Sequence, residues 1–326
     1  MGYKSTDSLM RHLRNSGIEI SGSSQKRQLI NTGYYHGYKG YRFFNQSKNR
    51  LPFISYSEIN ATILYDSKLK SLFYGKIMFI ETAMKNVALE CILKEANSED
   101  IQVILNKLVS SYNNAPASLP VEKKKKLQQN KLNLQGSIQT SLSKAYKADN
   151  PIITHFYNHN GYSGVPIWAL FEIMTMGDFG FLLSCLTYDV RDKISKRLKI
   201  NVSCDTERCL IYKYIYALKD LRNAIAHNSV VFDTRFSKID VNRAMKKCLE
   251  LEMKLPYVNF KTIVDYVLLM CYYLKLLGVS KTEIKAFVRE FEKITEDYSK
   301  YFRNNLSSKV IHPDLSKKIS ALKKYI

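Results

Sequence analysis

The feature that most constrains the fold is residues 61–95, where apolar side chains recur every three or four positions without an intervening proline. This spacing puts the apolar side chains on one face and predicts a single long helix. Glu81 and Lys85 lie one turn apart on it and can form an ion pair, either at the surface or in support of a site. The apolar positions are Leu69, Leu72, Phe73, Ile77, Ile80, Met84, Val87, Ala88 and Cys91.

The same periodicity predicts further helices at residues 5–15, 165–200 (a pair), 206–227, 240–254, 259–277 and 281–303. Pro166 suits the start of the first helix of the pair, and Gly177 suits its end. No segment shows the alternation of a strand, and the chain has only 13 glycines and 7 prolines for turns. We therefore expect an all-α protein, with an N-terminal helical extension over residues 1–60, a helical domain over residues 61–326 and a basic insert at about residues 96–150.

The net charge is +21, because the chain contains 50 lysines and arginines but only 29 acidic residues. Such an excess favours a polyanionic partner, either nucleic acid or an anionic membrane surface, although a generally basic surface would give the same count. The most apolar run, residues 267–274, is too short to span a bilayer. It is predicted to be a buried helix, and no membrane partner is expected.

The six cysteines form no C-x-x-C pair, and no histidine lies near Cys204 and Cys209. We therefore expect no metal and no cofactor, and reduced thiols fit a cytoplasmic protein. The first residues contain no apolar signal core. Phosphate-binding glycine loops, nucleophile elbows and clustered carboxylates are also missing from the sequence, which leaves few routes to catalysis.

Two segments mix features that suit RNA binding. Aromatic and basic residues alternate in LINTGYYHGYKGYRFF, where they could stack on bases and neutralise phosphates or else pack in the core. A lysine run in the basic insert could follow a phosphate backbone or be a solvated face. The residues concerned are Tyr34, Tyr35, Lys39 and Arg42 in the first segment and Lys123, Lys124, Lys125 and Lys126 in the second.

The segment LKDLRNAIAHNSVVFD, residues 218–233, offers a candidate site in Arg222, Asn223 and His227. On an ideal helix Arg222 and His227 would lie about 140° apart, because each residue turns by about 100°. They can meet only if the helix ends near Ala226; otherwise they converge on a ligand or on a site shared across a symmetric dimer. Two supporting residues, Tyr216 and Asp220, share the helix face of His227.

The motif LRNAIAH resembles the R-N-x-x-x-H signature of HEPN-domain ribonucleases. The wider chain resembles the Abi-like (abortive infection, AbiD/AbiF) family of bacterial phage-defence proteins over residues 29–236. Two departures stand out, since Lys85 occupies a position where arginine is expected and residues 96–150 match poorly. The stretches that carry the resemblance are LINTGYYHGYKGYRFF, FIETAMKNVALE, VPIWALFEIMTMGDFGFLL and LKDLRNAIAHNSVVFDTRF.

The resemblance implies a HEPN-like helical bundle that cleaves RNA without metal, by attack of a ribose 2′-OH on the adjacent phosphorus. His227 would be the general base or acid, Arg222 would brace the phosphorane oxygens, and Asn223 would orient the imidazole or hold the phosphate. Asp220 and Glu81 would support the site. The resemblance also implies a homodimer and a structured non-coding RNA as partner. Two alternatives remain open, a non-catalytic RNA-binding module and one half of a toxin–antitoxin pair with a nucleotidyltransferase.

Overall fold

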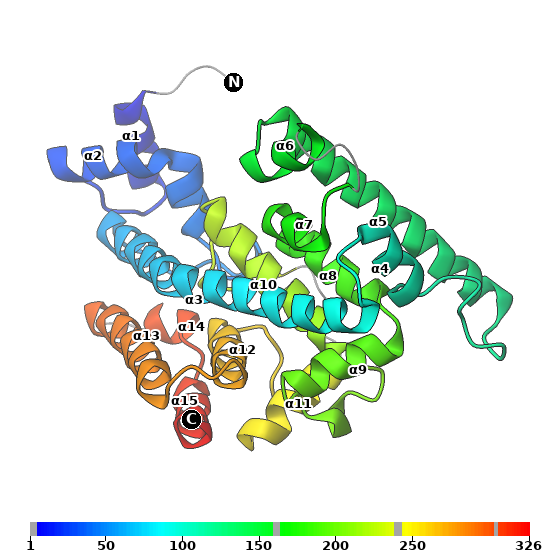
Figure 1. The fold of residues 1–326 in the computed structure, drawn as a ribbon. Helices are drawn as coiled ribbons and strands as arrows, with labels where there is room; N and C mark the ends of the chain where they lie inside the picture. Colours follow the sequence, from blue (N-terminus) through cyan, green and yellow to red (C-terminus); the bar gives the residue numbers. More distant parts are fainter. Residues whose placement is uncertain (1–4, 159–163, 238–242, 303–305) are drawn as a thin grey trace. The chain divides into compact units, whose positions relative to one another are not determined.

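The computed structural model describes residues 5–158, 164–237, 243–302 and 306–326. Its regular elements in these ranges are helices, so the all-α prediction is confirmed (Figure 1). Strand-like pairing is limited there to isolated bridges such as Glu19–Ser55. None of the described helices has the length and apolar character needed to cross a membrane.

The chain forms two compact units, each discontinuous in sequence. The first comprises Met1–Ile77, Asp220–Val241 and Leu249–Ile326, and the second comprises Met78–Lys219 and Asn242–Cys248. Three helices contribute residues to both units: α3 (Tyr56–Ala96), α10 (Leu210–Ala226) and α11 (Arg243–Met253). Helix α3 confirms the long helix expected at residues 61–95 and extends it at the N-terminal end.

The first unit begins with α1 (Thr6–Asn15), α2 (Gly22–Thr32) and the π-helix η1 (Gly33–Lys39). Ser5 caps α1 by accepting a hydrogen bond from the Ser8 N–H at 3.3 Å. Gly37 is required in η1, because a Cβ atom there would lie 2.9 Å from Thr32 Oγ1. Helices α2 and η1 are in contact. The segment LINTGYYHGYKGYRFF, residues 29–44, is called the aromatic-basic segment below, and α2 packs against its π-helix.

The core of the first unit is built around α12 (Ile263–Leu276), which is buried on every side from Ile263 to Leu274. This confirms the buried helix expected at residues 267–274. Helices α13 (Lys281–Tyr301) and α15 (Leu315–Tyr325) pack against it, and α14 (Leu306–Val310) packs on α13 (Figure 1). A buried ion pair of 2.7 Å between Lys318 and Asp265 joins α15 to α12.

In the second unit α5 (Val121–Lys147) packs along α6 (Pro151–Asn158), α7 (Ile167–Ile173) and α8 (Met176–Cys185) (Figure 1). The basic insert is therefore largely helical, with α4 (Ile101–Leu108) preceding α5. Helix α11 (Arg243–Met253) is joined to α10 by a hydrogen bond of 2.9 Å from the Tyr214 hydroxyl to the Met245 carbonyl.

The prediction of two helices over residues 165–200 was wrong, because three are present: α7, α8 and α9 (Tyr188–Arg197). The first ends at Ile173, and Gly177 lies inside the second. Thr175 caps α8 by accepting a hydrogen bond from the Asp178 N–H at 3.2 Å. The break expected at Gly177 therefore lies at Met174 and Thr175, and the break between α8 and α9, at Leu186 and Thr187, was missed because no glycine or proline marks it.

Candidate functional site

The candidate site is built on the end of α10. The helix ends at Ala226, and Asn228 takes a left-handed φ of 51°. The Asn228 N–H donates to the Ile225 carbonyl at 3.1 Å, and the Ser229 N–H donates to the Ala224 carbonyl at 2.7 Å. These two bonds form a Schellman motif, which ends a helix sharply. His227 therefore lies just past the end of the helix, as expected, and is exposed.

Arg222 and Asn223 occupy the last turn of α10, and both are half-buried. An Arg222 guanidinium N–H donates to Asn223 Oδ1 at 3.3 Å, so these two predicted site residues touch. The His227 backbone N–H donates to the Asn223 carbonyl at 3.0 Å. The Schellman turn thus presents the imidazole to solvent directly beyond a half-buried guanidinium and amide.

The chain that follows the motif is held by Asp66, a fully buried carboxylate on α3. Asp66 Oδ1 accepts the N–H groups of Val231 and Phe232 at 2.8 and 2.7 Å. Its Oδ2 accepts the Tyr41 hydroxyl at 2.8 Å and pairs with Lys70 Nζ at 2.8 Å. Burial raises the pKa of the Tyr41 phenol, and Asp66 raises it further, so Tyr41 stays a hydrogen-bond donor.

A second set of hydrogen bonds joins the chain after α10 to the chain after η1 within the first unit. Arg235 pairs with the buried Asp233 and donates to the Gly40 and Phe43 carbonyls, each at 2.7 Å. Asp233 also accepts the Asn45 N–H at 2.7 Å. Residues 230–235 and 40–45 are therefore tied together by charge-assisted hydrogen bonds.

The structure adds four polar residues that the sequence did not single out: Asp66, Lys70, Asn228 and His36. Lys70 Nζ donates to Asn228 Oδ1 at 2.8 Å, and Asn228 Nδ2 lies 3.2 Å from His36 Nε2. The i, i+4 spacing of Asp66 and Lys70 was a local signal for this pair. His36 and Asn228 are 192 positions apart, so no local pattern could reveal their contact.

Of the supporting residues, Asp220 lies near the buried Tyr266 of α12. The pKa of the Tyr266 phenol is raised chiefly by burial and also by Asp220. Tyr216 belongs to the second unit, where its ring packs on α8 at Gly180, and a Cβ atom on that glycine would lie 3.0 Å from the ring.

Glu81 also lies in the second unit, and Lys85 Nζ pairs with its carboxylate at 3.2 Å. The pair lies inside the protein rather than at the surface, with side chains 7% and 14% exposed for Glu81 and Lys85. Lys85 also donates to the Met174 carbonyl at 2.6 Å, which gives this lysine a role within the second unit.

The aromatic-basic segment has residues both in the core and at the surface. Tyr38 and Tyr41 are buried, whereas Tyr35 is 78% exposed. Tyr34 packs edge-on against Tyr35 at 5.4 Å between ring centroids. Cations lie over two of these rings, with Lys39 Nζ 5.5 Å from the Tyr34 centroid and Arg42 Cζ 5.9 Å from the Tyr38 centroid.

The lysine run forms the first turns of α5. Lys123, Lys125 and Lys126 are exposed, and Lys124 is half-exposed. Lys125 pairs with Glu122 at 3.2 Å, a pair in which both side chains are mostly exposed. Four consecutive cations at a helix N-terminus oppose the helix dipole, so intrinsic helix stability does not account for their placement.

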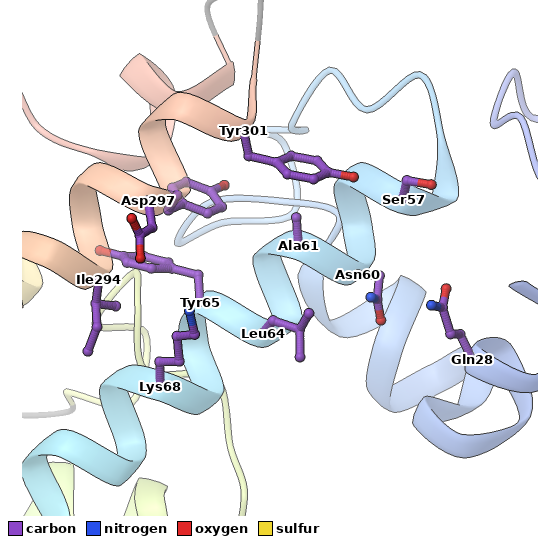
Figure 2. A pocket seen from close by; sticks show the side chains of 11 residues that line it. Gln28, Ser57, Asn60, Ala61, Leu64, Tyr65, Lys68, Ile294, Asp297 and Tyr301 are labelled. Carbon is purple, nitrogen blue, oxygen red and sulfur yellow. The ribbon is translucent and has the colours of Figure 1, made fainter. Parts of the chain in front are cut away.

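A pocket of about 250 Å³ opens on α3 in the first unit, with α2 and α13 as its walls (Figure 2). Asn60, Leu64 and Lys68 of α3 line it, with Gln28 and Tyr301 from the neighbouring helices. Its lining includes neither Asp66 nor Lys70, and it includes no residue of α10. The pocket is therefore distinct from the site at the end of α10. Within the described residues no group of His, Cys, Asp and Glu could hold a metal ion.

A family model described as Abi-like protein matches residues 27–233, more than half of the chain. The chain belongs to the Abi-like protein family. The matched range contains the aromatic-basic segment, α3, the basic insert and the whole of the Arg222–His227 motif. No curated protein and no solved structure matches the chain. Family membership connects the chain to abortive infection, a form of phage defence.

Replacing Asp66 by alanine is expected to lower the free energy of unfolding by about 3–5 kcal/mol, because Lys70 loses its buried partner and two backbone N–H groups lose their acceptor. Urea unfolding measures the loss, and hydrogen exchange at Val231 and Phe232 should quicken. The control is Asp7→Ala, which removes a pair with Lys26 whose side chains are 68% and 41% exposed. It should cost less than about 1 kcal/mol. Equal effects of the two substitutions would contradict the role of Asp66.

Proposed function

We propose that this Abi-like protein is a metal-independent endoribonuclease of the HEPN type that acts in phage defence. The observation that carries the proposal is the end of α10, where the Schellman turn exposes His227 directly after the Arg222–Asn223 contact. The 2′-OH attacks the adjacent phosphorus, and the products are a 2′,3′-cyclic phosphate and a 5′-OH.

The residue types at the site suit this chemistry. Histidine side chains ordinarily titrate near neutrality and can transfer protons in either direction. A guanidinium carries a permanent charge and can donate two parallel hydrogen bonds to phosphorane oxygens. Asn223 is already in contact with Arg222, so its amide can fix the guanidinium or hold the scissile phosphate.

RNA is the proposed substrate, and a structured non-coding RNA is the proposed regulatory partner. Two features support a polyanion, the net charge of +21 and the exposed lysines of α5. The rings and cations of Tyr34, Tyr35, Lys39 and Arg42 add a surface on which unpaired bases can stack.

A second candidate function is RNA binding without cleavage. In this case a cytoplasmic protein would form a complex with a structured non-coding RNA or with a toxin–antitoxin partner. The exposed lysine run supports it, because cations that contact phosphates can bind RNA without the Arg222–His227 site. This candidate predicts that phage protection survives substitution of both Arg222 and His227.

His227→Ala and Arg222→Ala are each expected to slow RNA cleavage in EDTA by about 10²–10⁴-fold, because each removes a group that acts in the transition state. Electrophoresis of cellular RNA incubated with purified protein measures the rate. The matched controls are His155→Ala and Arg289→Ala, both at exposed positions on other helices. If the two site variants cut as fast as the controls, the assigned site is wrong.

We further propose a homodimer in which Arg222 of one subunit works with His227 of the other. Unfolding and refolding an equal mixture of Arg222→Ala and His227→Ala proteins should then restore about a quarter of the wild-type rate, because half of the dimers would hold one intact pair. Light scattering checks that dimers form. A mixture that stays inactive while dimers form would place each pair within one subunit.

Replacing the four lysines at 123–126 by alanine should weaken RNA binding and lower the slope of log affinity against log salt by up to about 3, at roughly 0.7 per phosphate contact. Fluorescence anisotropy over a salt series measures this slope. The control replaces four exposed lysines of α13, namely Lys281, Lys285, Lys293 and Lys300. Equal slopes for the two quadruple variants would mean that the run on α5 is only a solvated face.

A further inference from the structure

The pocket between α2, α3 and α13 lies within the first unit, and the proposed ribonuclease reaction does not use it (Figure 2). Its volume is about 250 Å³. Ligand sites are usually larger, at roughly 300–1,000 Å³. The pocket therefore has room for one small molecule or for one unit of a polymer, and a dinucleotide cofactor would not fit.

The buried part of the pocket lining is aromatic. Tyr65 and Tyr298 stack with ring centroids 4.4 Å apart. Both hydroxyls have partners in the core, because the Tyr298 hydroxyl lies 3.1 Å from Thr62 Oγ1 and Tyr65 shares a hydrogen bond with Thr295. A ligand therefore meets the carbon atoms of these rings. Tyr301 is 53% exposed, and Figure 2 shows its ring reaching from α13 toward α3, where it can stack on a flat heterocycle.

Two carboxamides, those of Gln28 on α2 and Asn60 on α3, lie at one end of the pocket (Figure 2). The Gln25 Nε2 group donates to Ser57 Oγ at 2.9 Å, and Gln28 and Asn60 each follow three residues later on the same face of their helix. Both carboxamides are half-buried, and neither has a hydrogen-bond partner among the described residues. A carboxamide both donates and accepts, so it can pair with the N6 and N7 atoms of adenine.

The other end of the pocket carries two opposite charges. Lys68 of α3 and Asp297 of α13 are exposed there, and neither forms an ion pair with a described residue (Figure 2). The Cα atoms of Asn60 and Lys68 are about 12 Å apart, at 1.5 Å per residue of helix, and a mononucleotide spans a similar length from base to phosphate. An ammonium group binds phosphate, and a carboxylate accepts hydrogen bonds from ribose hydroxyls.

Other classes of ligand satisfy only part of this lining. A bare anion would suit Lys68 but would be repelled by Asp297. A free amino acid could pair with both charges, but it is too short to reach Asn60 as well. An acyl chain would leave the charges and the carboxamides without partners. A flat heterocycle joined to a sugar and a phosphate meets every wall of the pocket.

We propose that this pocket binds one adenine ribonucleotide. The adenine ring stacks on Tyr301, and its N6 and N7 edge pairs with the carboxamides of Asn60 and Gln28. Asp297 accepts the ribose hydroxyls, and Lys68 binds the phosphate. This chemistry has two sources, a free nucleotide such as AMP and an unpaired adenosine of a bound RNA. The pocket is separate from the end of α10, so the proposal does not rest on the proposed ribonuclease function.

Isothermal titration calorimetry of the full chain with AMP tests the free source. One AMP should bind per chain, and GMP, CMP and UMP should each bind at least about tenfold more weakly, because they lack the N6 and N7 pattern of adenine. Adenosine and 2′-deoxy-AMP should each lose about tenfold in affinity, since one lacks the phosphate and the other a ribose hydroxyl. Lys68→Ala should bind AMP and adenosine equally, and Asp297→Ala should bind AMP and 2′-deoxy-AMP equally.

Asn60→Leu keeps the approximate size of the side chain but removes its hydrogen bonds, so this variant should lose the preference for AMP over GMP. The matched controls are Lys293→Ala, an exposed position of α13 outside the pocket lining, and Asp7→Ala on α1. Both should bind AMP as wild type does. Circular dichroism checks that each variant is folded.

Two RNA hairpins that differ in one loop nucleotide, adenosine or uridine, test the second source. The His227→Ala protein is used, so that cleavage does not interfere, and fluorescence anisotropy measures binding. An adenosine loop that enters the pocket should bind about tenfold more tightly than the uridine loop. Adding Asn60→Leu should abolish that difference.

AMP binding that weakens in the pocket variants supports the proposal with a free nucleotide as ligand, and a loop preference that needs Asn60 supports it with RNA as ligand. The proposal is overturned if the protein binds no nucleotide and binds both hairpins equally. It is also overturned if all three pocket variants bind AMP as wild type does, or if GMP binds as tightly as AMP. RNA cleavage is measured in neither arm, so these results leave the proposed function to its own tests.

Discussion

The buried carboxylate of Asp66 is the interaction on which the candidate site depends. It accepts two backbone N–H groups from the chain after α10, accepts the Tyr41 hydroxyl and pairs with Lys70. A buried charge is tolerated only when its partners satisfy it, so these bonds must form together. Two of the partner regions, at Tyr41 and at Val231–Phe232, are distant from Asp66 in sequence, so one side chain on α3 joins the chain after His227 to the segment that contains His36.

The position of the site follows from how α10 ends. The Schellman turn stops the helix at the residue before the histidine. Lys70 donates to the side chain of Asn228, whose backbone is left-handed. Exposure of the His227 imidazole is therefore a consequence of the backbone.

The sequence predicted the main helices and the position of His227, and each feature that it missed has a physical reason. The 3–4 spacing predicted α3 and α12, and the motif geometry placed His227 at a helix end. The break between α7 and α8 was predicted a few residues late, at Gly177, and the break between α8 and α9 was missed because no glycine or proline marks Leu186 and Thr187. The His36–Asn228 contact was beyond prediction, since it depends on a third residue, Lys70, and on packing across the fold.

If the end of α10 catalyses attack by a ribose 2′-OH, the termini of the RNA products report on this attack directly. RNA cut by the purified wild-type protein in EDTA can be digested to nucleotides and examined by mass spectrometry. Attack by the 2′-OH should leave 2′,3′-cyclic phosphates at the new 3′ ends and 5′-hydroxyls on the other fragments. Fragments that carry 3′-hydroxyls and 5′-phosphates would contradict it, because water rather than the 2′-OH would then be the nucleophile.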